Sequence, residues 1–258
     1  MRQERSAEWL RWMGEVRATL LAHDVADAPP EAGGFFRHNW MMHTPALMRH
    51  PPLPAMDWTI QGLIEKVGDI EVQVQVNRLA EPDYERLSGT LRQRLRFADF
   101  AEEVLNGTDN DVYMTANNAD ANGTLMQALA MDLLPQHPLL RPHPGAGFLW
   151  IGKGTVTPLH HDLTNNLLVQ LVGQRRVYLI PPAEQPRLEN TRHVHSDLRT
   201  VDDLDERNIA YTEVHMGPGD TLFVPVGWWH RVEAPGISMM VSYTNFWWPN
   251  FWNTGFPD

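Results

Sequence analysis

The chain has 258 residues, 43% of them hydrophobic and 9% aromatic, which is enough apolar surface for a substantial core. It contains no cysteine, and this excludes disulfides, iron–sulfur clusters and thiolate zinc sites, so any metal must be held by imidazole and oxygen. The formal charge of −11 argues against binding nucleic acid through its phosphates and against binding an anionic membrane surface.

The first half of the chain combines helical and extended patterns. Residues 71–78, EVQVQVNR, alternate strictly between apolar and polar side chains, which is typical of a strand with one exposed face. Helical spacing of apolar residues or short apolar runs predict the other elements. These are helices over 4–22, 59–67, 97–105 and 124–134, a short helix or turn over 35–40, and strands over 45–49 and 111–117.

From Gly147 onward the chain consists of short apolar runs with turn residues roughly every ten positions. Regular short strands of this kind predict a β-sandwich or barrel. The polar stretch over 187–208 is expected to form a long loop over one end. No internal repeat or linker is evident, so we expect a single domain over 1–258, with helices and strands in 1–110 and the barrel core in 111–250.

The most informative stretch is Thr-Pro-Leu-His-His-Asp, residues 157–162. Alternate side chains of a strand share a face, so His160 and Asp162 point the same way and His161 points the other way. A second imidazole from a distant strand would complete two histidines and one carboxylate on one face of a metal. That arrangement leaves coordination positions open and suits non-haem Fe(II).

The stretch Gly219–His230 offers the second imidazole. A Gly-Pro-Gly-Asp turn starts an apolar strand, and Pro225 and Gly227 then bend the chain just before His230. Two tryptophans precede His230, and an apolar surrounding of this kind favours a neutral ring that can bind metal. The two stretches together predict the metal ligands His160, Asp162 and His230.

These two stretches resemble the cupin-like, JmjC-type Fe(II)/2-oxoglutarate oxygenases. Gly219–His230 is similar to the second cupin motif, and WIGKGTVTPLHHD, GQRRVYLIPP and NFWW extend the resemblance over roughly residues 110–250. Within that group the chain resembles the hydroxylases related to factor inhibiting HIF and the small JmjC hydroxylases. The resemblance implies a mostly β fold, the double-stranded β-helix or jelly roll, with N-terminal helices packed on the barrel.

The resemblance also implies the cofactors and their contacts. His160, Asp162 and His230 would hold Fe(II), and 2-oxoglutarate would be the cosubstrate. Residues matching the family's cosubstrate pocket are Tyr113, Thr157, Asn166, Asn245 and Trp247.

Arg175 marks a departure from the family pattern. Relatives carry a lysine after the Gly-x pair to bind the cosubstrate carboxylate, whereas this chain has Gly173-Gln174-Arg175-Arg176. A guanidinium can pair a carboxylate with two hydrogen bonds, so Arg175 is expected to replace the lysine. Strand alternation places Arg176 on the opposite face. The alternative is that both arginines lie on the surface.

The resemblance implies an oxygenase that hydroxylates an amino-acid side chain in a protein, a peptide or a small molecule, with succinate and CO2 as co-products. Two other readings of the residues remain open. One is a cupin dioxygenase or isomerase that does not use 2-oxoglutarate, and the other is a binding protein that retains the barrel. The cosubstrate contacts favour the 2-oxoglutarate-dependent oxygenase over the first of these alternatives. The intact set of two histidines and one carboxylate argues against the second, because such a set would be costly without a metal.

Partners and location follow from composition. No apolar segment of signal or membrane-spanning type is present, so we expect a cytoplasmic protein without membrane or nucleic-acid partners. The sequence leaves the oligomeric state and the substrate undetermined. The same-face pair His193 and His195 lies in the polar stretch with no third ligand nearby in sequence, so an exposed loop is expected there.

Overall fold

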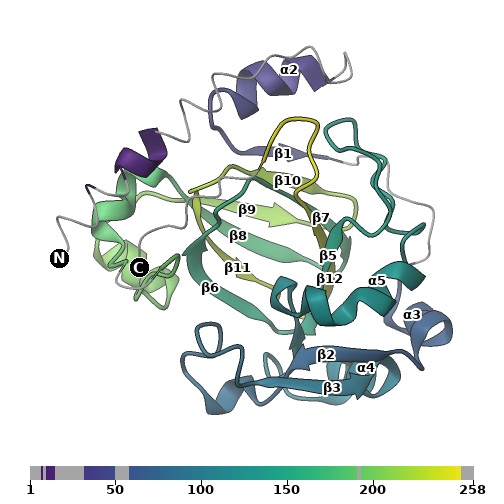
Figure 1. Ribbon diagram of the computed structural model, residues 1–258. Coiled ribbons are helices and arrows are strands. Elements are labelled where there is room, and N and C mark those ends of the chain that lie inside the picture. Colours follow the sequence, from purple (N-terminus) through teal and green to yellow (C-terminus); the bar gives the residue numbers. More distant parts are fainter. Residues whose placement is uncertain (1–6, 8–9, 15–31, 50–57, 191–192, 251–258) are drawn as a thin grey trace.

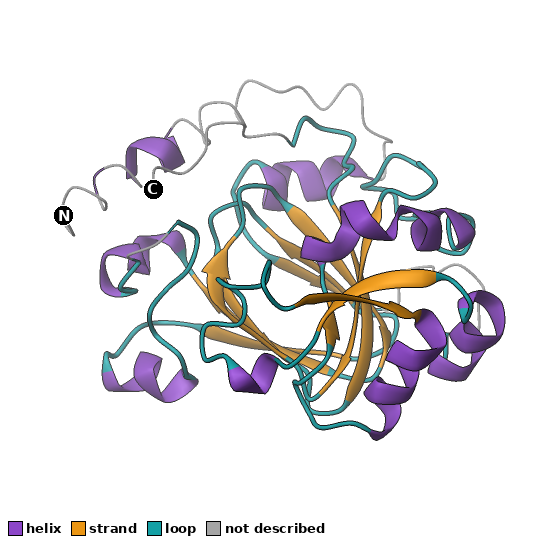
Figure 2. Cartoon of the chain, turned by 60° about the horizontal axis from the view of Figure 1, so that its bottom comes forward, coloured by secondary structure: helices purple, strands orange, loops and turns teal. Residues whose placement is uncertain are grey.

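The computed structural model describes residues 7, 10–14, 32–49, 58–190 and 193–250. Residues 10–14 are helical, and the rest of the helix expected over 4–22 lies outside the described residues, apart from residue 7, which is also helical. Within these residues, twelve strands form two antiparallel sheets. Figures 1 and 2 show the strands stacked at the centre, with helices around them.

The larger sheet has eight strands in the order β1-β10-β7-β12-β5-β4-β2-β3. Its strands are β1 Ala46–Met48, β2 Glu71–Gln75, β3 Arg92–Arg96, β4 Tyr113–Met114, β5 Gly147–Lys153, β7 Asn166–Val172, β10 Thr221–Val224 and β12 Ile237–Tyr243. The smaller sheet has the order β6-β11-β8-β9. Its strands are β6 Val156–His161, β8 Arg175–Ile180, β9 Thr212–Met216 and β11 Trp229–Glu233.

The helices lie outside the two sheets, as Figure 2 shows. They are α2 Gly33–Phe35 with the π-turn Phe36–Trp40, α3 Ile60–Val67, α4 Phe97–Asn106, α5 Gly123–Ala128 and α6 Val201–Glu206. Short 3-10 turns span Arg78–Ala80, Ala116–Asn122 and Pro182–Arg187. The Thr59 hydroxyl accepts a hydrogen bond from the Gly62 amide and begins α3, as an N-cap does. Among the described residues no helix combines the length and the apolarity needed to cross a bilayer.

Two hydrophobic clusters divide the interior. The smaller cluster lies between the sheets, where Leu168, Val177, Leu222, Val232 and Met240 come from five different strands. We call this space the lumen. The larger cluster packs helices α3 and α4 and the N-terminal aromatic residues on the outer faces. This mostly β architecture with two antiparallel sheets confirms the predicted jelly roll.

The polar stretch over 187–208 differs from the expected long loop. Thr200 and Asp203 form a capping box that begins helix α6. Ahead of the helix, the chain runs along the edge of β6, where His161 N donates to Val194 O at 3.0 Å and Ser196 N donates to Leu159 O at 3.0 Å. The prediction of a long loop is therefore wrong, because these polar residues pair with a strand edge and cap a helix.

Candidate metal centre

The three predicted ligands come together at one end of the lumen. His160 near the end of β6 lies directly opposite His230 near the start of β11 in the strand register. Asp162 follows β6, and its two carboxylate oxygens lie 3.8 Å from His160 Nε2 and 3.6 Å from His230 Nε2. One ligand atom from each residue falls within 4.8 Å of the other two. Two imidazoles and one carboxylate therefore converge on a single point.

Backbone carbonyls orient both imidazoles. His160 Nδ1 lies 2.8 Å from Pro158 O, and His230 Nδ1 lies 3.0 Å from Trp228 O. A carbonyl oxygen only accepts, so each Nδ1 carries a hydrogen, and Nε2 is the nitrogen of each ring that can bind a metal. Burial lowers the pKa of His230 to about 4, which keeps its ring neutral at pH 7. This is the tautomer and charge state that binds a metal.

The bend before His230 is tied to the strand that carries Asp162. Gly227 has φ +75, a conformation that glycine adopts easily, and its amide donates to Asp162 O at 3.1 Å. Nearby, His43 Nε2 lies 2.6 Å from Val226 O. The predicted role of Pro225 and Gly227 in turning the chain toward the cluster thus has a direct structural counterpart, since the bend docks against the ligand strand.

Asn166 lies beside the carboxylate ligand. Its side chain is 9% exposed, and Nδ2 donates to Asp162 Oδ2 at 2.6 Å. The hydrogen bond fixes the orientation of the Asp162 carboxylate, as residues behind metal ligands commonly do. Asn166 was expected to contact the cosubstrate, and the structure places its amide against Asp162 of the His160–Asp162–His230 cluster.

A β-bulge in β6 decides where Thr157 points. In the register of β6 with β11, His160 pairs with His230 and Thr157 pairs with Val232, so Pro158 and Leu159 together oppose one residue. Directly paired residues share a face of the sheet. Thr157 therefore faces the lumen with Val232, and it is 8% exposed.

Tyr113 lies deeper in the lumen, over a glycine. It pairs with Gly152 on β5, which pairs in turn with Ser238 on β12. A Cβ at Gly152 would come within 2.9 Å of the Tyr113 ring. The Tyr113 hydroxyl is buried and has no hydrogen-bond partner among the described residues. Buried hydroxyls are normally satisfied, so this one is free to bind a ligand.

Arg175 is a buried cation at the start of β8. Its side chain is 1% exposed and Nε donates to Ser238 Oγ at 2.8 Å, whereas Nη2 is buried and finds no partner in the part of the chain that the structure describes. Arg176 is exposed, so the two arginines lie on opposite faces as predicted. Among the described residues no carboxylate pairs with Arg175. An unpaired buried charge is costly, and an anionic ligand would compensate it.

Asn245 and Trp247 make their described contacts elsewhere. Asn245 Nδ2 donates to Arg141 O at 2.6 Å, and the Arg141 guanidinium lies 5.7 Å from the Trp247 ring centre. The indole NH of Trp247 and Oδ1 of Asn245 are buried, and neither has a partner within the described ranges. The part of the structure described here gives neither residue a contact with the His160–Asp162–His230 cluster, so their cosubstrate role stays a prediction.

His195 lies beside the His160–Asp162–His230 cluster, although the sequence predicted an exposed loop at this position. It forms a β-bridge with His160, and the two ring centres are 6.0 Å apart. Burial lowers its pKa to about 4. The interpretation as an exposed loop is therefore wrong for His195, because edge pairing with β6 carries it next to a ligand.

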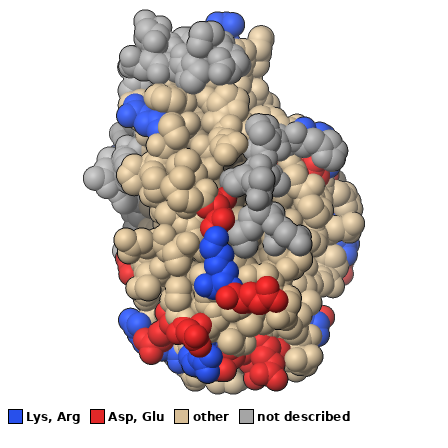
Figure 3. Space-filling view, turned by 90° about the vertical axis from the view of Figure 1, so that its right-hand side faces the viewer, with Lys and Arg blue, Asp and Glu red and all other residues tan. Residues whose placement is uncertain are grey.

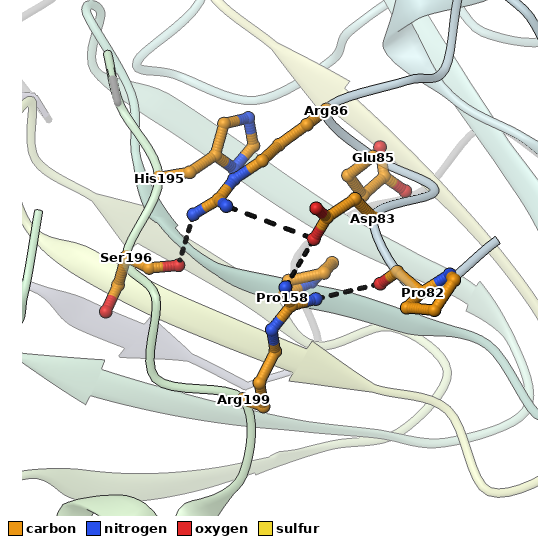
Figure 4. Close-up of a pocket in the computed structure, with 8 residues that line it drawn as sticks. All are labelled: Pro82, Asp83, Glu85, Arg86, Pro158, His195, Ser196 and Arg199. Atoms are coloured by element: carbon orange, nitrogen blue, oxygen red, sulfur yellow. Dashed lines mark hydrogen bonds and ion pairs between the residues drawn. The ribbon is translucent and has the colours of Figure 1, made fainter. Parts of the chain in front are cut away.

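Figure 4 shows the small pocket that His195 lines, between the loop after β2 and the segment 193–199. Two arginines cross it in opposite directions. Arg86 Nη2 donates to Ser196 O at 3.0 Å and to Asp197 at 2.5 Å, while Arg199 pairs with Asp83. We call the contacts of Arg86 and Arg199 the clasp, since they join the segment 193–199, beside the His160–Asp162–His230 cluster, to the loop after β2.

Sequence reasoning missed Arg78, which lies behind Tyr113. The Arg78 guanidinium is fully buried, 4.9 Å from the Tyr113 ring centre, and pairs with Glu85 at 2.7 Å. It also missed Gln170 and Ser238 in the lumen. Those two residues carried a signal, since each is a polar side chain within a mostly apolar strand and faces inward.

Comparison with known proteins places the chain among cupin-like proteins. Residues 42–254 match the cupin-like domain family. Lysine-specific demethylase JMJ30 of Arabidopsis thaliana is 35% identical over 111 residues, which cover 39% of this chain and 25% of that protein. Jumonji C domain-containing protein 5 of Drosophila melanogaster is 27% identical over 229 residues, or 81% of this chain and 53% of that protein.

A third relative is matched over more of its own length. The tRNA wybutosine-synthesizing protein 5 of Danio rerio is 27% identical over 239 residues, which cover 83% of this chain and 71% of that protein. The matched region is only a quarter of the Arabidopsis protein and about half of the Drosophila protein.

Proposed function

The chain belongs to the cupin-like domain family. From that membership and from the His160–Asp162–His230 cluster we propose that it is an Fe(II)- and 2-oxoglutarate-dependent oxygenase. The observation that carries the proposal is the convergence of two imidazole Nε2 atoms and one carboxylate within 4.8 Å. Two histidines and one carboxylate on one face leave the opposite side open, the pattern of non-haem Fe(II) oxygenases.

The lumen supports 2-oxoglutarate as the cosubstrate. His230 lies opposite Leu179 in the register, and Arg175 lies four residues earlier on β8, roughly 13 Å along the strand. The Arg175 side chain and a small dicarboxylate together fit this interval. Its unpaired Nη2 and the unpaired Tyr113 hydroxyl suit the distal carboxylate, with Thr157 between them and the metal. A buried cation without a carboxylate partner among the described residues fits an anionic ligand such as this cosubstrate.

Each residue then has a definite task. His160, Asp162 and His230 hold the iron, and Asn166 keeps the Asp162 carboxylate oriented. Arg175, Tyr113 and Thr157 bind and orient the cosubstrate. Bound Fe(II) with 2-oxoglutarate and O2 supplies the oxidation of a substrate C–H bond to an alcohol, with succinate and CO2 as co-products. The apolar side chains of the lumen exclude water from that reaction.

We propose an amino-acid side chain, in a protein or peptide or as a small molecule, as the substrate. The relatives named as lysine-specific demethylases include proteins of Arabidopsis thaliana and Xenopus tropicalis. Hydroxylation of an N-methyl carbon gives a product that loses formaldehyde, so the same chemistry can remove a methyl group. On the face shown in Figure 3, lysines and arginines lie among acidic side chains, and no continuous basic patch is visible on the part of the chain drawn there.

The test is turnover of 2-oxoglutarate with Fe(II) and O2. Succinate should form slowly without a primary substrate and faster with members of a peptide set that includes methylated and unmethylated lysine and arginine. Asp162→Ala should abolish both rates because it removes the carboxylate ligand. Succinate formation that persists in Asp162→Ala would refute the proposal.

A further inference from the structure

The lumen holds a second layer of polar residues around Arg175, which the proposed function does not use. Ser238 is fully buried on β12, and its Oγ accepts hydrogen bonds from Arg175 Nε at 2.8 Å and from Gln170 Nε2 at 3.0 Å. The guanidinium is therefore attached to the neighbouring sheet through one hydroxyl. Ser238 lies on β12 in the eight-stranded sheet, whereas Arg175 lies on β8 in the four-stranded sheet.

Gln170 is itself held in one orientation. Its Nε2 also donates to Val172 O at 2.7 Å and to Gly173 O at 3.3 Å. Carbonyl oxygens accept hydrogen bonds only, so these two contacts fix which end of the amide faces them. Gly173 has φ +71, and a Cβ there would lie 2.0 Å from Ile237 O, so glycine is required at this turn. The backbone of the turn thereby fixes Gln170, and Gln170 fixes Ser238.

This arrangement depends on arginine. Nε–H is the donor to Ser238, and once it is committed, only the terminal nitrogens of Arg175 remain for a ligand. A lysine has no donor at that point of the side chain and presents a single rotatable ammonium. A guanidinium that is held at Nε presents its fork in a fixed orientation, which lowers the entropy lost when a carboxylate binds.

We propose that Ser238 is a positioning residue for the cosubstrate, which orients the Arg175 guanidinium toward the distal carboxylate of a 2-oxo dicarboxylate. Gln170 holds the Ser238 hydroxyl in place. The inference rests on the proposed function, because it assigns the anion at Arg175 to the cosubstrate. It adds that selectivity for a dicarboxylate over a 2-oxo monoacid depends on Ser238.

The experiment measures anaerobic binding of 2-oxoglutarate to the Fe(II)-loaded protein by its visible charge-transfer absorbance. Ser238→Ala should weaken 2-oxoglutarate binding by about tenfold, the order expected when one hydrogen bond to a charged group is lost. In an Arg175→Lys background the same substitution should change the affinity by less than about twofold, since lysine makes no such bond. A Ser238→Ala variant that binds 2-oxoglutarate as the wild type does would overturn the inference.

A second ligand separates positioning from a general loss of structure. The probe 2-oxobutyrate has the same 2-oxo acid end but no distal carboxylate. Its affinity should be equal in the wild type and in Ser238→Ala, so the preference for the dicarboxylate should fall by the same factor of about ten. Equal weakening of both ligands would show that Ser238 supports the fold rather than the guanidinium, and it would contradict the proposal.

Two controls keep the result interpretable. Ser242 lies on the same face of β12 as Ser238, but its hydroxyl accepts from Trp150 Nε1 at 2.9 Å. Ser242→Ala should therefore leave the selectivity for 2-oxoglutarate unchanged. If Ser238→Ala does not fold, Ser238→Cys keeps the volume with a weak acceptor and should show the same loss of selectivity. If neither 2-oxo acid gives a band with wild-type protein, the proposed function fails; if both do, only the role of Ser238 is being tested.

Discussion

Thr157 and His160 face the same side of β6 although they are three positions apart in the sequence. Strict alternation would place them on opposite faces. The bulge at Pro158 and Leu159 restores a common face, because two residues of β6 oppose one of β11. Proline suits this position, since it has no amide hydrogen to contribute to the ladder. The bulge thus allows one short strand to offer both a metal ligand and a cosubstrate hydroxyl to the lumen.

Thr157→Val tests that arrangement, because it preserves the shape of the side chain and removes the hydroxyl. We expect the affinity for 2-oxoglutarate to fall by up to about tenfold, the range for one neutral hydrogen bond, while Fe(II) affinity stays unchanged. The measurement is a titration of each ligand separately. Thr212→Val, at an exposed position of β9, is the matched control and should alter neither affinity.

Asn166→Ala should weaken metal binding without removing a ligand. The lost hydrogen bond to Asp162 Oδ2 frees the carboxylate to rotate, and residues behind metal ligands typically contribute 10–100-fold to affinity. Competition for Fe(II) against a chromophoric chelator measures the change. Gln127→Ala, on the exposed side of α5, serves as the control. An unchanged Fe(II) affinity in Asn166→Ala would rule out this role for the amide.

The clasp should keep the segment 193–199 against β6. Its ion pairs are partly exposed, so each contributes at most about 1 kcal/mol to global stability. Asp197→Asn and Asp83→Asn together should nevertheless raise amide hydrogen exchange in 193–199 several-fold, with little change in the melting temperature. Glu71→Gln breaks the exposed pair with Arg94 and should leave exchange in that segment as it was. Equal exchange in all variants would show that backbone pairing with β6 suffices.

Because His137 is buried, we expect the free energy of unfolding to fall in acid. Its Nδ1 accepts from Leu139 N at 3.3 Å, and burial lowers its pKa from 6.5 to about 4. Between these values the unfolded chain binds a proton that the folded chain does not, so the stability present above pH 6.5 is lost as the pH falls toward 4.

The slope from His137 alone is at most about 1.4 kcal/mol per pH unit. His137→Gln should make the decline of the unfolding free energy between pH 6.5 and 4 less steep. Chemical denaturation at several pH values measures it. A variant with the same slope as the wild type would remove His137 from this explanation.

The elements predicted best from sequence are those in which one local rule decides the outcome. The spacing of His160 and Asp162, the bend before His230 and the opposite faces of Arg175 and Arg176 follow from strand alternation and from turn residues. His160, Asp162 and His230 then come together once β6 pairs with β11. Helix α3 and strand β1 follow equally from their apolar patterns.

The place of His195 and the Arg175–Ser238 contact were missed because contacts distant in sequence decide them, whereas helix α6 had a local signal. His195 is carried to His160 by edge pairing, which no period in residues 187–208 indicates. The capping box of Thr200 and Asp203 was readable as Thr-x-x-Asp, and it could have predicted helix α6. The Arg175–Ser238 hydrogen bond joins strands from two different sheets, and only the folded chain brings them together.

The central claim is that His160, Asp162 and His230 hold Fe(II) together with 2-oxoglutarate in the lumen. Anaerobic titration of the metal-free protein with Fe(II) and 2-oxoglutarate tests it most directly. We expect a visible charge-transfer band that saturates at one equivalent of each and is lost in His160→Ala. No band with the wild-type protein, or a band of the same intensity in His160→Ala, would contradict the claim.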